Sequence, residues 1–444
     1  TPTVTPTAKP TPTPTPKKKR TIRVITFADW LMTGLIQKGE KQPLLKEFEK
    51  ETGINVEFEF GPEDAIREKM ILDASAGTKL YDIYGLSPEI IAQYAVPGYI
   101  EPLDEWVKSP NPKYFLGLDD LYPAVVKGCS YEGKLYGLAN YWWGNGLTYR
   151  KDLFEKYDVE IPKTFEDLEQ VCETLAEGFK KDKLKDTYPI VFRAVKGEEP
   201  TLEAMGVAWA YGGSWFEGKA STAREIKEKK AKPALNSPET VAGISELVKI
   251  LQKWGDPGCP SYSWYECAKA VGTGRAAMFL GLAGECWYIK VVEAKAFDPY
   301  NLSLCLPPKG PFDYAQAFYA TIFSMNSKCE NKEDAWQVIQ LLTSPQNMME
   351  QAKGGVNTFA SKTVMDRPEL MEWSKSDKET IDAIKEIFRI TKPEYDPKFP
   401  EYPDVCYQIG TSVSEAVAGM RTPKEAMDIA QAKALDIMTK AGYY

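Results

Sequence analysis

From Thr21 onward, the chain alternates segments patterned as buried strands with segments patterned as amphipathic helices. Residues 21–28, TIRVITFA, are almost continuously apolar, as in a strand buried on both faces of a sheet. A helix is predicted over about 40–52, and residues 54–60, INVEFEF, alternate apolar and polar side chains as a strand does. Residues 72–87, LDASAGTKLYDIYGLS, predict the end of a helix, a turn and a third strand. This alternation predicts an α/β fold with parallel sheets covered by helices on both faces.

The ends of these strands indicate where a ligand would lie. In open α/β sheets, ligands bind beyond the carboxyl ends of the strands. That rule selects one segment after each of the first three strands: Asp29-Trp30, Gly61 to Glu63, and Ser87 to Glu89. From these segments, we take Trp30, Ser87 and Glu89 as candidate ligand-binding residues.

Length and composition narrow the class of protein. At 444 residues the chain is long for one hydrophobic core, so two domains are expected. No apolar run approaches the roughly 18 residues that a membrane-spanning helix needs. The net charge of −8 argues against nucleic acid as a partner, because such binding requires clustered basic residues. An uncharged small ligand fits this composition better.

Histidine is absent, which excludes Ser-His-Asp and HExxH chemistry. A mechanism that uses only carboxylates stays open, because the chain has 63 acidic residues. The eight cysteines include no CxxC pair and no zinc-like spacing, so we predict no metal site and no cofactor. We expect most cysteines to be small buried hydrophobic residues. In an exported protein, Cys259 with Cys267 and Cys286 with Cys305 are the candidate disulfide pairs.

The amino-terminal segment differs in composition from the rest of the chain. Residues 1–16 alternate Thr and Pro, which offers little apolar surface to bury and favours extended polyproline II. At about 3.1 Å per residue, this segment would reach roughly 50 Å. With the basic run Lys17 to Arg20, it predicts a Thr/Pro-rich disordered spacer over residues 1–20, attached to something upstream.

Four blocks in a fixed order carry a family resemblance. After residues 72–87 come GLTYRKDLFEKYDVEIPKTFEDL at 146–168, TGRAAMF at 273–279, and LCLPPKGP followed by NKEDAWQVIQLLTSPQ between 304 and 346. Together they resemble the sugar-binding, maltose-binding-protein-like type of extracellular solute-binding proteins, which feed ATP-driven importers. Two departures stand out. The usual Tyr-Asn-Lys-Asp appears here with Arg150 as its second residue, and the family's tryptophan after AAM lies two residues further on, at Trp287.

The resemblance implies a periplasmic-binding-protein-like fold, with two α/β lobes joined by hinge crossings and a sugar bound in the cleft between them. By analogy, the N-terminal lobe is 21–139 plus 274–320, and the C-terminal lobe is 140–273 plus 321–444. The implied partners are a sugar and the membrane permease of an ABC importer. The family's lipidated cysteine implies anchoring outside the cell through the spacer, with the lipid as the only membrane contact. We also expect a monomer.

A sugar ring presents flat C–H faces and a rim of hydroxyls, so its site needs aromatic platforms with oriented polar groups. The segment 140–146, NYWWGNG, falls where the first implied crossing lies. Adjacent side chains of an extended backbone point to opposite faces, so at least one of Trp142 and Trp143 is expected to face the cleft. The same segment supplies three further candidates, Asn140, Tyr141 and Asn145.

Other candidates come from five later segments. Tyr211 and Trp215 flank a double glycine near which family members place a ligand aromatic. Further aromatic and hydrogen-bonding candidates are Trp264, Trp287, Gln316, Tyr319 and Tyr402. For each of them, packing within the protein core is the alternative interpretation.

The aromatic content suggests the size of the ligand. The chain has 11 tryptophans and is 12% aromatic, which favours an oligosaccharide because several sugar rings need several platforms. We therefore predict a binding protein that makes or breaks no bond. Two alternatives remain open. One is a secreted glycoside hydrolase that uses a carboxylate pair. The other is a protein of the same fold that binds a peptide or a polyamine, and a polyamine cleft should be rich in carboxylates.

Overall fold

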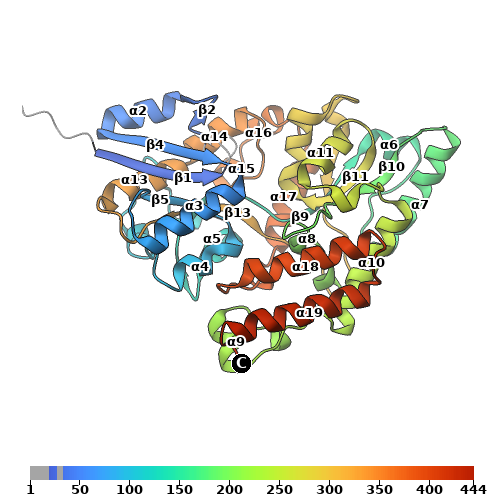
Figure 1. The fold of residues 1–444 in the computed structure, drawn as a ribbon. Helices are drawn as coiled ribbons and strands as arrows, with labels where there is room; N and C mark the ends of the chain where they lie inside the picture. Colours follow the sequence, from blue (N-terminus) through green and yellow to red (C-terminus); the bar gives the residue numbers. More distant parts are fainter. Residues whose placement is uncertain (1–19, 28–33) are drawn as a thin grey trace, which may run out of the picture.

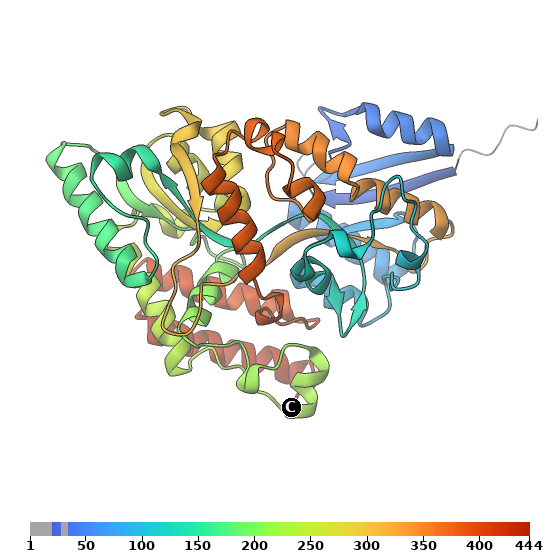
Figure 2. The ribbon, with the colours of Figure 1, turned by 180° about the vertical axis from the view of Figure 1, so that it is seen from behind.

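Two separate β-sheets organise the chain, one in each of two lobes (Figure 1). The computed structural model describes residues 20–27 and 34–444. The predicted spacer over residues 1–20 therefore lies outside the described residues, except for Arg20, which begins the first strand. Viewed from behind, the same two lobes lie side by side, with α9 and the carboxyl end of the chain below them (Figure 2).

The sheet of the first lobe has the strand order β4-β1-β5-β13-β8. Strands β1 and β4 pair in parallel over their whole length, and β13 runs antiparallel to both β5 and β8. The five strands are β1 (Arg20–Phe27), β4 (Ile54–Gly61), β5 (Ile83–Leu86), β8 (Leu138–Trp143) and β13 (Tyr319–Met325). The helices of this lobe are α2 (Pro43–Thr52), α3 (Glu63–Ala76), α4 (Ile91–Ala95), α5 (Pro123–Gly128), α13 (Lys332–Leu342), α14 (Pro345–Lys353), α15 (Lys362–Met365) and α16 (Glu369–Trp373).

The sheet of the second lobe has the order β10-β11-β9-β12. Its strands are β9 (Asn145–Arg150), β10 (Tyr188–Val191), β11 (Ala276–Leu282) and β12 (Leu302–Cys305). Helices α18 and α19 pack together and against α10, and α17 lies on β12. The helices of this lobe are α6 (Lys151–Lys156), α7 (Phe165–Lys181), α8 (Thr201–Ala210), α9 (Ala223–Lys229), α10 (Pro238–Trp254), α11 (Trp264–Gly272), α12 (Ala283–Tyr288), α17 (Lys378–Ile390), α18 (Tyr402–Val417) and α19 (Pro423–Lys440). Two small hairpins complete the strands, β2 (Ile36–Gln37) with β3 (Glu40–Lys41) and β6 (Ser130–Tyr131) with β7 (Lys134–Leu135).

Over the described residues, the chain crosses between the lobes three times, from β8 to β9, from β12 to β13, and from α16 to α17. Gly144 is the single residue between β8 and β9. A Cβ atom at this position would lie 2.5 Å from Thr391 Oγ1 and 2.7 Å from Ile387 Cγ2, closer than van der Waals contact allows. Glycine at the first crossing therefore lets the linking backbone pack directly against the end of α17.

Strand pairing corrects the predicted division of the chain between the lobes. Residues 274–320 were expected in the N-terminal lobe, but β11 and β12 pair with β9 and β10 in the second sheet. The region after residue 320 was expected in the C-terminal lobe, but β13 pairs with β5 and β8 in the first sheet. The apolar sequence of a strand does not reveal which sheet the strand joins, because every strand offers the same backbone hydrogen-bonding groups. We now propose that the second boundary between the lobes lies between β12 and β13.

The expected early strands are confirmed, and so is the helix predicted over about 40–52, except that it begins at Pro43 because Glu40–Lys41 forms strand β3. Strands β1, β4 and β5 occur where the apolar patterns predict them, and α2 and α3 end at Gly53 and Gly77 in the left-handed conformation. The prediction of parallel sheets is wrong in part, because β9 is antiparallel to both β11 and β12. Strand β9 is entered directly from the other lobe, so no helical crossover fixes its direction.

All eight cysteines are free and buried, so the expected packing role is confirmed and neither candidate pair is a disulfide. Burial raises the pKa of Cys129 and of Cys259 to about 12, which keeps both thiols protonated. Within residues 20–27 and 34–444, no helix combines the length and the apolar character needed to span a bilayer.

Candidate functional site

A cavity between the two lobes lies at the carboxyl edge of the first sheet. Its volume is about 90 Å³. The first lobe contributes Glu63 and Arg67 from the start of α3, Glu89 after β5, and Tyr319 at the start of β13. The second lobe contributes a larger set of mainly polar residues: Arg193, Glu198, Glu199, Thr201, Leu202, Asp396, Tyr402 and Cys406. Charged side chains from both lobes thus converge on one small space.

A second cavity, of about 630 Å³, lies between α5, the β6–β7 hairpin and residues 393–398. Asp396 lines both cavities. We place the candidate site in the smaller cavity for two reasons. It lies at the strand ends where ligands of α/β folds bind, and it is lined by more ionisable side chains per unit of space, which is typical of functional sites.

Arg67 is the central residue of the site. Its Nη2 donates to Glu63 Oε1 at 2.6 Å and to Ser87 Oγ at 2.9 Å, and it also pairs with Glu89. Its Nη1 pairs with Glu198, which belongs to the other lobe. One guanidinium group therefore holds two carboxylates of the first lobe and bridges the cavity to a third.

The electrostatics of the site reflect burial of more carboxylates than cations. Burial raises the pKa of Glu63, and it raises the pKa of Glu198 to about 7, although Arg67 opposes both shifts. Burial also raises the pKa of Asp396 to about 7, and Asp396 accepts a hydrogen bond from the Tyr402 hydroxyl. Glu198 and Asp396 can therefore exchange protons near neutral pH when their surroundings change.

Arg193 forms the second cationic wall of the cavity. It is buried and pairs through Nη2 with Glu203 Oε1 at 2.5 Å. Its Nε has no hydrogen-bond partner among the described residues, although the guanidinium group lines the cavity. A buried donor without a partner is costly, so this N–H favours a ligand that supplies an acceptor oxygen.

Aromatic rings lie against one side of the site. Tyr319, which lines the cavity, stacks on Trp143 with ring centroids 5.6 Å apart and an interplanar angle of 27°. Trp143 donates from Nε1 to Thr358 Oγ1 at 2.8 Å, and its indole also lies against Gly284 at the start of α12. Trp143 is partly exposed, so among the adjacent tryptophans it is the one that keeps an accessible edge.

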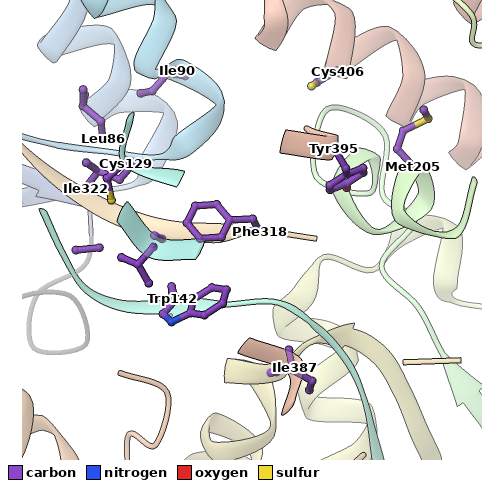
Figure 3. Packing of buried hydrophobic residues seen from close by; sticks show 14 of the residues in the cluster. Leu86, Ile90, Cys129, Trp142, Met205, Phe318, Ile322, Ile387, Tyr395 and Cys406 are labelled. Carbon is purple, nitrogen blue, oxygen red and sulfur yellow. The ribbon is translucent and has the colours of Figure 1, made fainter. Parts of the chain in front are cut away.

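Trp142 has a different environment from Trp143. Its ring is fully buried and stacks on Phe388 of α17 with centroids 4.0 Å apart. Figure 3 shows Trp142 on the crossing strand, with Phe318 on one side and Ile387 on the other. In this arrangement Trp142 holds the crossing together and presents no surface to a solute.

The remaining candidates of the first crossing are also buried. Asn140 donates from Nδ2 to Gln351 Oε1 at 3.1 Å, and the Tyr141 hydroxyl bonds Thr321 Oγ1 at 2.5 Å. Asn145 donates from Nδ2 to the Gln316 carbonyl at 3.3 Å. These side chains bond to the protein itself, so as ligand residues they stay predictions.

The later aromatic candidates lie in packing clusters, apart from the two tyrosines of the cavity. Trp215 is buried with its ring 5.0 Å from that of Tyr402, and Tyr211 lies 5.7 Å from Phe165. Trp264 and Trp287 both contact the ring of Tyr288. Trp30 lies outside the described residues. Of the candidates named from sequence, the cavity brings together Glu89, Tyr319 and Tyr402.

Most of the charged lining was not among the named candidates, and one available signal would have found part of it. The strand-end rule selected Glu63 in the first lobe. Applied to the second sheet, the same rule would have selected the loop after β10, which carries Arg193, Glu198 and Glu199. Arg67 and Asp396 carry no such signal, because one lies inside a helix and the other lies far from any strand.

The described part of the chain contains no group of three or more cysteine or acidic side chains arranged to hold a metal ion. The carboxylates of Glu63, Glu89 and Glu198 instead surround the Arg67 guanidinium group. The cavity therefore offers charged donors and acceptors of hydrogen bonds.

Comparison with known proteins identifies the family. Residues 33–349 match the family described as bacterial extracellular solute-binding protein. The chain belongs to this family. Its two-lobed fold matches a crystal structure of an ABC transporter solute-binding protein from Agrobacterium radiobacter K84 in complex with ribitol. That match has a TM-score of 0.79 and 25% identity, over 94% of this chain and 98% of the other.

Two relatives of this solute-binding protein are similar in sequence. An erythritol/L-threitol-binding protein of Mycolicibacterium smegmatis is 25% identical over 332 residues, which are 71% of this chain and 66% of the relative. A mannitol-binding protein of Pseudomonas aeruginosa is 22% identical over 402 residues, 86% of each chain. The match thus spans just under two thirds of the first relative and most of the second.

Proposed function

We propose that this protein captures a short polyol or a single sugar between its lobes and delivers it to the membrane permease of an ABC importer. The observation that carries the proposal is the cavity, which is lined mainly by charged and hydroxyl-bearing residues, is built from both lobes and measures about 90 Å³. That volume is far below the roughly 300 Å³ at which drug-sized pockets begin. Relatives that bind erythritol, threitol and mannitol, and a similar structure that holds ribitol, support a solute of this size.

The lining suits a solute whose hydroxyl groups both donate and accept hydrogen bonds. Glu63, Glu89 and Glu198 offer acceptor oxygens, and the free Nε of Arg193 offers a donor. The Tyr319 ring would lie against the C–H groups of the carbon chain. Because the carboxylates come from both lobes, one solute would bind them together and stabilise closure.

An oligosaccharide ligand stays a prediction, and it has less support than a polyol ligand. Several sugar rings would need several accessible platforms, and among the described candidate tryptophans Trp142, Trp215 and Trp287 are buried. A glycoside hydrolase is the less favoured alternative, because the matching relatives are binding proteins. We further propose that the protein works outside the cell as a monomer, held at the membrane by a lipid upstream of residues 1–20 and needing no cofactor.

Calorimetric titration with erythritol, ribitol, mannitol and maltotriose tests the proposal. We expect one of the polyols to bind at a ratio of one to one and maltotriose to bind weakly or not at all. At about 100 times its dissociation constant, that polyol should raise the free energy of unfolding by about 2.7 kcal/mol. Tight binding of maltotriose alone would restore the oligosaccharide. Release of reducing ends during long incubation would support the hydrolase instead.

A cationic polyhydroxy solute is the second candidate. The cavity is lined by five carboxylates and two arginines, and Arg193 is already paired with Glu203. That excess of negative charge was the sequence-based criterion for a polyamine site, and an ammonium group would complement it. Parallel titrations with sorbitol and 1-amino-1-deoxysorbitol separate the candidates, since the two compounds differ only in that group. Tighter binding of the amine would favour the cationic solute.

A further inference from the structure

Residues 393–398, which link α17 to α18, are anchored to the second lobe. The Tyr395 hydroxyl donates to the Leu202 carbonyl at 2.7 Å. The backbone N–H of Lys398 donates to the Ser221 carbonyl at 2.7 Å, and Lys398 forms a parallel bridge with Thr222. The backbone of Lys398 therefore moves with the second lobe.

The side chain of Lys398 enters the first lobe. Its Nζ donates to the carbonyl oxygens of Gly128 at 2.5 Å, Ser130 at 2.7 Å and Lys127 at 3.3 Å. These carbonyls lie at the carboxyl end of α5 and the start of β6, where the last carbonyls of a helix lack helical partners. A lysine ammonium has three donors, and all three are used across the boundary between the lobes.

The end of α5 is itself fixed to the crossing strands. Gly128 lies against the Phe318 ring, so closely that a Cβ atom there would overlap it. Phe318 in turn packs against Trp142, with ring centroids 5.5 Å apart. Lys398 therefore bonds to a part of the first lobe that packs directly against the crossing strands.

Neighbouring contacts between the lobes are weaker. Lys127 pairs with Glu394 at 2.8 Å and Arg224 pairs with Glu132 at 3.6 Å, and three of these four side chains are more than 40% exposed. Exposed pairs of this kind contribute little. The three hydrogen bonds of Lys398 are made by a charged, partly buried group, and such bonds are roughly twice as strong as neutral ones.

We infer that Lys398 is a positioning residue, which holds the lobes in the closed arrangement and thereby raises affinity for the solute without touching it. Opening the lobes separates its ammonium group from all three carbonyls at once. Apparent affinity is reduced in proportion to the fraction of molecules in the binding-competent form. The effect on affinity rests on the proposed function, whereas the effect on lobe separation does not.

The test compares Lys398→Met with Lys392→Met in the full chain, by small-angle X-ray scattering and by titration with ribitol and mannitol. Lys392 pairs with Asp313, on the segment that packs on α8 of the second lobe, so its replacement removes one positive charge without touching the α5 contact. We expect Lys398→Met alone to increase the radius of gyration. We also expect it to weaken binding of the polyol about tenfold, as when the closed fraction falls tenfold.

Two further variants keep the outcome decisive. Lys398→Arg retains charged donors and should restore much of the compact form, which loss of packing alone would not explain. Lys398→Gln replaces Lys398→Met if the latter does not fold. Equal radii of gyration for the Lys398 variants and the Lys392 control would overturn the inference, even if no polyol binds. A larger radius of gyration for Lys398→Met, together with no polyol binding by the wild-type protein, would support the inference and refute the proposed function.

Discussion

Replacement of Trp142 offers a direct check on whether this ring joins the lobes or contacts a solute. The indole is fully buried and stacks on Phe388 of the other lobe. Trp142→Ala would leave a cavity there, and buried aromatic truncations cost about 3–5 kcal/mol. The Nε1 of Trp142 is buried without a hydrogen-bond partner among the described residues. An unpaired buried donor costs about 1–3 kcal/mol, so its removal in Trp142→Phe offsets part of the stability lost through poorer packing.

We therefore expect Trp142→Phe to stay within about 1 kcal/mol of the wild-type free energy of unfolding, while Trp142→Ala loses at least 3 kcal/mol. Urea unfolding followed by circular dichroism and by fluorescence measures both values, and coincident transitions would justify a two-state fit. Calorimetric titration with the polyol then measures affinity on each folded variant. The reasoning fails if Trp142→Ala keeps the wild-type free energy of unfolding. If that variant keeps its stability but loses affinity for the polyol, the ring contacts the solute.

Three further predictions concern the site and the crossing. Arg67→Met should weaken polyol binding at least 30-fold, about 2 kcal/mol, because it leaves clustered carboxylates unpaired. The control is Arg23→Met, which removes an exposed ion pair, and calorimetric titration should detect no change in its affinity for the polyol. Burial raises the pKa of Glu198 and of Asp396 to about 7, so between about pH 4 and 7 the folded protein holds protons that the unfolded chain releases. Their contribution to stability therefore falls as pH rises through that window. The melting temperatures of Glu198→Gln and Asp396→Asn, relative to wild type, should accordingly be higher at pH 7.5 than at pH 5, and an equal difference at both would contradict the assignment. Gly144→Ala should lose about 1–3 kcal/mol in urea unfolding through overpacking, and an unchanged midpoint would show that the crossing has room for a methyl group.

The sequence by itself determined the local elements of this protein and its family. Apolar runs placed β1, β4 and β5, and the glycines after α2 and α3 marked the ends of those helices. These features depend on neighbours in sequence, through the periodicity of side chains and the left-handed conformation that glycine tolerates. The ordered blocks identified the family for the same reason, since each block is a local pattern.

Only the tertiary structure decided which strands share a sheet and which side chains meet. Strands β11 and β12 joined the second sheet against the prediction, because backbone hydrogen bonds do not distinguish one apolar strand from another. Among the described tryptophans chosen for ligand stacking, Trp142, Trp215 and Trp287 are buried. A large apolar ring can pack in a core or against a sugar, so the sequence alone did not separate the two environments. Arg67 and Glu198 are far apart in sequence and meet only when two lobes close, so their pairing depends on long-range geometry that no local pattern encodes.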